Sequence, residues 1–150
     1  MSNDPVLDRI GEALALFNTG RRSDARTAFA TIWAEIETDG EPFHRCALAH
    51  YMADAQDELA DELMWDRRAL AAANEMGAHS PDASLSVLSF YPSLHLNLAD
   101  VLHRMGDLAA ARQHLHLAEA SVDALSDDGY GQMIRNGIAR LAERLSEGGK

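Results

Sequence analysis

The chain has 150 residues, enough for one domain with a buried core, and its balance of 47% hydrophobic and 25% charged residues excludes an intrinsically disordered protein. The formal net charge is −11, and no segment is basic, which disfavours nucleic acid and anionic membranes as partners and favours a basic one. Charges interrupt every apolar stretch well before it reaches the length of a membrane-spanning helix.

The first half of the chain predicts four helices. Apolar residues recur with a period near 3.6, and no stretch keeps the alternation of a strand. Asp4 and Pro5 are typical of a helix start, and Gly20 is typical of a helix end, so the first helix is expected at about 5–18. The same periodicity predicts helices at about 22–37, 43–56 and 58–76.

The second half predicts a short helix and three longer ones. Ser80-Pro81-Asp82 is a start signal for a short helix that runs to about 90, where Pro92 is expected to break the chain. Helices are expected after it at about 92–105, 108–125 and 130–146, with Gly106 between the first two. The fold class predicted from these elements is all-α.

Two distant segments repeat the same spacing of small, large and glycine residues. The separations of seven, five, four and three residues occur once in the set Ala13, Gly20, Ala25, Phe29, Ile32 and once in the set Ala99, Gly106, Ala111, Leu115, Ala118. In each set a small residue lets a second helix approach, a glycine makes the turn, and the last three residues fill the groove between the two helices. Each set therefore predicts one antiparallel helix pair.

These residues resemble the tetratricopeptide repeat family. The better copy, from Pro92 to Ala118, has the Leu98-Ala99 pair and the Gly106-Asp107 turn typical of that family. The resemblance implies one domain over 1–150, an antiparallel helix-turn-helix solenoid with pairs at about 5–37, 43–76 and 92–125, an insertion at about 78–91 and a capping helix at about 130–146. It also implies a protein-binding module rather than an enzyme, without a cofactor.

In that family the first helices of the pairs line a concave groove that holds a peptide or a partner helix. By analogy the partner is a protein or peptide, or a second copy in a homo-oligomer. An alternative is that Phe17 and Tyr51 belong to the core. The residues implied to face the groove are Leu14, Phe17, Asn18, Tyr51, Asp54, Asn97, Asp100 and Arg104.

A different class of function is a small-molecule or metal site. His50 and Asp54 share a helix face at i,i+4, and His95 is expected on the next unit, so these three side chains are the weak candidates for a metal. No established metal-binding or catalytic motif accompanies them. Around Gly129 and Gly131, Tyr130 and Arg135 form a candidate anion site at a helix start.

Compartment and source follow from weak compositional signals. The N-terminal Met1-Ser2-Asn3-Asp4-Pro5 has no features of a signal peptide, so we expect a cytoplasmic protein. The single cysteine, Cys46, forms no internal disulfide and is expected to be a buried small side chain. All basic residues except Lys150 are arginine, which favours a GC-rich bacterial genome.

Overall fold

The computed structural model describes residues 4–79 and 90–148, and over these residues the chain is helical and contains no strand. The all-α prediction is confirmed. The chain divides into two compact units, Met1–Glu75 and Met76–Lys150, and the prediction of one domain over 1–150 stays a prediction. The predicted insertion at about 78–91 falls largely outside the described residues. None of the described helices has the length and apolar character needed to cross a membrane.

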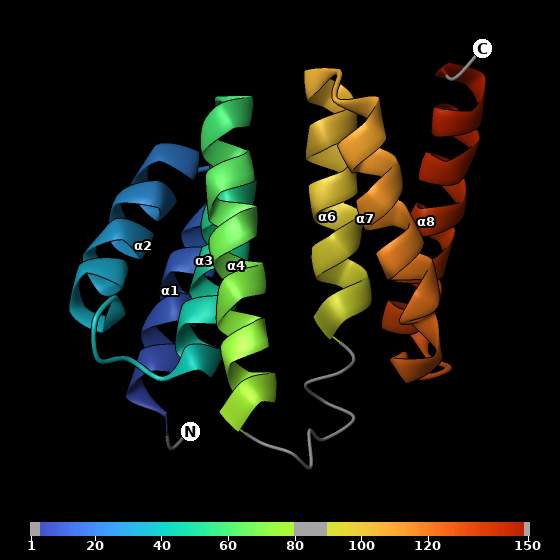
Figure 1. The fold of residues 1–150 in the computed structure, drawn as a ribbon. Coiled ribbons are helices and arrows are strands. Elements are labelled where there is room, and N and C mark those ends of the chain that lie inside the picture. The colour runs from blue at the N-terminus through green and yellow to red at the C-terminus, as the bar shows by residue number, and fades with distance from the viewer. Residues whose placement is uncertain (1–3, 80–89, 149–150) are drawn as a thin grey trace. The chain divides into compact units, whose positions relative to one another are not determined.

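The first unit contains four helices, and consecutive ones run antiparallel (Figure 1). α3 packs across both α1 and α2. Asp4 starts α1, because its carboxylate accepts the backbone N–H groups of Val6 and Leu7 at 3.1 Å each. The bounds are α1 Pro5–Asn18, α2 Arg22–Ile36, α3 Pro42–Asp54 and α4 Leu59–His79, whose last four residues belong to the second unit.

The second unit contains a hairpin and a third helix that packs against both of its members. Asp107 caps α7 by accepting the backbone N–H of Ala110 at 3.2 Å. The bounds are α6 Phe90–Met105, α7 Leu108–Ala120, the 3₁₀ turn η1 Val122–Ala124 and α8 Gly129–Gly148.

Both copies of the repeated spacing occupy equivalent positions in their hairpins. Gly20 and Gly106 make the turns with φ angles of 85° and 87°, a left-handed conformation that glycine adopts without a steric penalty. The other eight positions are all buried: Ala13, Ala25, Phe29, Ile32, Ala99, Ala111, Leu115 and Ala118. The sequence pattern therefore marked the small residues that let each pair of helices pack closely.

α6 begins two residues earlier than predicted. We expected Pro92 to interrupt the chain, but α6 starts at Phe90 and holds Pro92 in its first turn. A proline is tolerated there because the first N–H groups of a helix have no partner within the helix.

Candidate functional site

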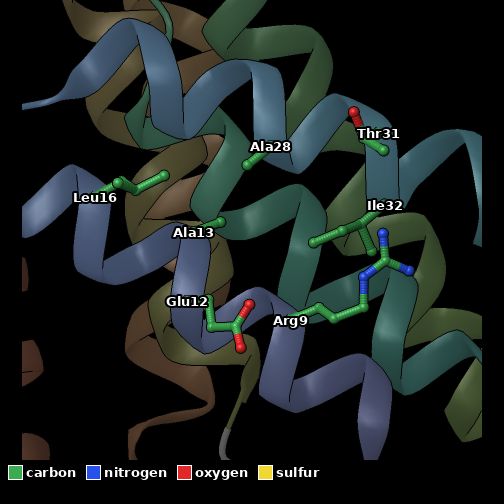
Figure 2. A pocket seen from close by; sticks show the side chains of 7 residues that line it. All are labelled: Arg9, Glu12, Ala13, Leu16, Ala28, Thr31 and Ile32. Carbon is green, nitrogen blue, oxygen red and sulfur yellow. The ribbon is translucent and has the colours of Figure 1, made fainter.

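A groove runs along one face of the α1–α2 hairpin (Figure 2). Its volume is about 400 Å³. Buried Ala13 and Ile32 form part of its floor, while the polar side chains come from both helices. The lining residues are Arg9, Glu12, Ala13 and Leu16 of α1 and Ala28, Thr31 and Ile32 of α2.

The rest of the first unit packs on a different face of α2. The ring of Phe29 stacks on Tyr51 of α3 at 6.4 Å, and Trp33 meets Trp65 of α4 edge-on at 4.9 Å. Residues 28, 31 and 35 lie on another side of the helix from 29 and 33. Figure 2 accordingly shows α3 behind the two helices that form the groove.

The rim of the groove carries charges of both signs. Arg9 forms an ion pair with Glu35 across the two helices, and both side chains are about half exposed. Glu12 adds a second carboxylate, and Thr31 adds a hydroxyl that donates to the Thr27 carbonyl at 3.1 Å. An apolar floor between charged rims is suited to the apolar side of an amphipathic helix.

The residues predicted to face a groove in the first unit lie beside this groove rather than in it. Leu14 and Phe17 are half-buried and Asn18 is exposed, but none of them lines it. The Arg22 guanidinium lies over the Phe17 ring, 5.7 Å from its centre. Tyr51 is half-buried against Phe29, so it has a packing role.

Arg22 also joins the α1–α2 turn to the α3–α4 turn at one end of the first unit. Its Nε donates to the Asp57 carboxylate at 3.1 Å, and Arg26 donates to the same carboxylate at 2.9 Å. The guanidinium of Arg26 and, with a smaller effect, that of Arg22 hold the pKa of Asp57 below its usual value. The pKa of Asp54 is raised, because nearby protein atoms displace part of the water around its exposed side chain.

Two of the three groove residues predicted in the second unit, Asp100 and Arg104, belong to a salt-bridge cluster. The Arg104 guanidinium donates to the Asp100 carboxylate at 3.1 Å within α6, and Arg144 of α8 approaches the same carboxylate to 3.9 Å. Asn97 is half-buried on the same helix. Asp100 therefore helps to join α8 to α6.

In the candidate anion site at Tyr130 and Arg135, the guanidinium of Arg135 already donates hydrogen bonds to the protein. Arg135 donates to the backbone carbonyls of Val122, Leu125 and Ser126 at 3.3, 3.2 and 3.4 Å. Tyr130 is half exposed at the start of α8. An anion would have to compete with three carbonyl groups for Arg135.

The candidate metal ligands are divided between the two units. His50 and Asp54 lie on α3, whereas His95 is buried on α6. Over residues 4–79 and 90–148, no three or more histidine, cysteine or acidic side chains gather where a metal ion could bind. Cys46 is buried, as predicted, and burial raises the pKa of its thiol to about 11.

The sequence reasoning missed the partner of His95. His95 Nδ1 lies 3.1 Å from His114 Nδ1 of α7 and within hydrogen-bonding distance of it. The two residues lie eleven and eight positions from Gly106, on opposite arms of the hairpin. Similar distances from a predicted turn were the signal that could have identified the pair.

Comparison with protein-family models, with curated proteins and with solved structures found no match to this chain.

Proposed function

We propose that this chain is a protein-binding module of the tetratricopeptide-like type, and that the groove between α1 and α2 binds an amphipathic helix of a partner protein. The observation that carries the proposal is the apolar floor at Ala13, Ala28 and Ile32 between two helices. Alanine at such positions lets another helix approach closely, because little side chain separates the backbones.

The chain itself contains examples of a helix seated on a hairpin. α3 contacts both α1 and α2, and α8 contacts both α6 and α7. α8 packs closely against α6 at Gly137, because a Cβ placed on this glycine would lie 2.9 Å from the Leu96 side chain. These packings support the proposal that the other face of the α1–α2 hairpin also accepts a helix.

The charge of the first unit indicates which kind of partner helix the groove would bind. Residues 1–75 hold fifteen acidic and seven basic side chains, which gives this unit a formal charge of −8 out of −11 for the chain. A basic partner is attracted to such a surface and an acidic one is repelled. We therefore infer a partner helix with an apolar stripe flanked by lysine or arginine.

The proposal is tested with synthetic helices. A labelled Ala/Leu-striped peptide with lysine flanks is titrated with the full chain by fluorescence anisotropy, alongside the same peptide with glutamate flanks. We expect the lysine peptide to bind at least tenfold more tightly. Similar affinities, or no binding of the lysine peptide at millimolar concentration, would contradict the proposal.

Two substitutions on α2 locate the binding surface. Ala28 lines the groove, whereas exposed Ala30 lies two residues away on another side of the helix. We expect Ala28→Gln to weaken binding at least tenfold and Ala30→Gln to leave it unchanged. Equal binding by both variants would remove the groove from the proposal, even if the lysine peptide binds elsewhere.

A further inference from the structure

An open cavity lies in the second unit, between the start of α6 and the end of α7. Its volume is about 430 Å³. Small-molecule sites occupy roughly 300–1,000 Å³. The cavity is therefore large enough for a single aromatic ring with a substituent.

The two walls of this cavity differ in character. The α6 wall carries the rings of Tyr91 and His95, one helical turn apart, with centroids 6.1 Å apart and planes within 21° of each other. The opposite wall is aliphatic, with Leu117 and Ala120 from α7 and Ala124 from η1. Rings on one side and aliphatic groups on the other favour a flat apolar ligand.

His95 is held by His114 in a defined orientation. The ring centroids are 5.3 Å apart and the two Nδ1 atoms are 3.1 Å apart. The difference between these two distances is close to the sum of the two ring radii, so both nitrogens lie near the line that joins the ring centres. The two rings therefore meet edge to edge, with their Nδ1 atoms pointing at each other. One Nδ1 donates its hydrogen and the other accepts it. This bond satisfies a polar ring that is only 9% exposed.

The His95 ring is uncharged at neutral pH. Burial, followed by the effect of His114, lowers the pKa of His95 to about 4. In the tautomer whose Nδ1 accepts the shared hydrogen, the Nε2 of His95 carries a hydrogen and donates, whereas in the tautomer whose Nδ1 donates it, Nε2 is an acceptor. His95 therefore contributes a neutral aromatic surface rather than a cation.

The charge of the cavity is set by Asp123. Among the seven residues that line the cavity, Asp123 is the one acidic residue, none is arginine or lysine, and His95 is neutral. Ser121 adds a hydroxyl that donates to the carbonyls of Leu117 and Ala118 at 3.0 and 3.1 Å. The site thus lacks a group that would compensate an anionic ligand, whereas Tyr91 and Asp123 both attract a cation.

We propose that this cavity binds a small, flat aromatic molecule that is neutral or cationic. The ring would lie between the Tyr91–His95 wall and the aliphatic wall, with its polar substituent toward Asp123. This site is separate from the α1–α2 groove and does not depend on the proposed function.

Three ligands of the same shape and different charge test the proposal. Benzamidinium, benzamide and benzoate are each titrated into the full chain, and ¹H–¹⁵N correlation spectra are recorded. We expect saturable shifts at the amides of Tyr91, Leu117 and Ser121, with benzamidinium and benzamide binding at least tenfold more tightly than benzoate. No saturable shift with any ligand at millimolar concentration, or equal binding of benzoate, would overturn the proposal.

Variants on exposed positions distinguish this cavity from other surfaces. Ala120→Leu fills the cavity and is expected to weaken binding at least tenfold, whereas Ala109→Leu, exposed elsewhere on α7, should not. Leu117→Gln, with Met105→Gln as an equally exposed control, repeats the test in case Ala120→Leu alters the fold. Asp123→Asn should weaken the binding of benzamidinium more than the binding of benzamide. Wild-type affinity in both Ala120→Leu and Leu117→Gln would place the ligand elsewhere and overturn the assignment.

Discussion

At the residue scale, the pairing of His95 shows what a local pattern leaves out. The sequence grouped His95 with His50 and Asp54 because histidines and acids at helical spacing can bind metals. The structure instead gives His95 a partner nineteen residues later, in the other arm of its hairpin. Sequence spacing identified the side chain, but its protonation depends on burial and on a partner that only the hairpin brings close.

The low pKa of His95 predicts a loss of stability in mild acid. The pKa of His95 in the folded chain is about 4, below its ordinary value of 6.5, so the contribution of the neutral ring to stability is present above pH 6.5 and is lost as pH falls toward 4. Below pH 6.5 the unfolded chain takes up a proton that the folded chain does not. The loss is at most about 1.4 kcal/mol per pH unit.

Urea unfolding at neutral and mildly acidic pH measures this effect. We expect His95→Gln to lose less stability on acidification than the wild type, even if it is less stable at neutral pH. His116→Gln is the control, because His116 is 80% exposed beside Glu119. If His95→Gln showed the same acid response as the wild type, another group would be responsible.

A glycine in a turn and a glycine within a helix are expected to respond to alanine with opposite signs. Gly106 has a φ of 87°, so Gly106→Ala is expected to destabilise the chain by about 1–2 kcal/mol. Gly11 lies exposed within α1, and a Cβ added there would meet no atom of another element or side chain within 4 Å, so Gly11→Ala should stabilise the chain by up to about 1 kcal/mol. Chemical denaturation of both variants measures the opposite signs. Destabilisation by both would show that α1 does not accept the added methyl group.

At the element scale, caps and glycines predicted most helix bounds to within about two residues, because these signals are local. The end of α7 was different. We expected a helix to about 125, but α7 ends at Ala120 and η1 follows. No glycine or proline marks this position, and the turn is held by Arg135, which comes from the next helix. A break stabilised by a distant side chain leaves no local signal.

The hydrogen bonds of Arg135 predict its role in this turn. Arg135→Met leaves three carbonyl groups without this donor, so we expect a loss of roughly 1–2 kcal/mol in the free energy of unfolding. Arg135→Lys should recover only part of it, because an ammonium group lacks the planar fork of donors.

Arg140, exposed on the same helix, provides the control for this prediction as Arg140→Met. Urea unfolding compares the three variants. Wild-type stability in Arg135→Met would mean that the guanidinium is available for other contacts. The predicted anion site at Tyr130 and Arg135 would then gain support from any stabilisation by phosphate that depends on Arg135.

At the scale of the whole molecule, the sequence predicted the helical class and the two hairpins that share the repeated spacing. The middle pair matched the repeat poorly, so its packing could not be deduced from the pattern. The structure instead shows α3 and α4 held to α2 by aromatic contacts, Phe29 with Tyr51 and Trp33 with Trp65. The tetratricopeptide-like arrangement stays a proposal, because burial and hairpin turns alone do not define a solenoid.

Because the net charge is −11, salt is expected to act on folding and on binding with opposite signs. In the free chain, like charges repel one another most in the compact state. Raising the ionic strength from about 0.01 to about 0.15 M shortens the Debye length from about 30 to about 8 Å, which weakens this repulsion. We expect a stabilisation on the order of 1 kcal/mol, or a melting temperature about 3 °C higher.

Binding of the lysine-flanked helix should respond to salt in the opposite way, because its affinity depends on attraction to the acidic first unit. Over the same change in salt we expect the affinity to fall severalfold, whereas a peptide with serine flanks should bind with little change. Anisotropy and thermal unfolding in the same buffers measure both effects. If salt strengthened binding of the lysine peptide, the apolar floor of the groove would dominate recognition and the inferred basic character of the partner would be wrong.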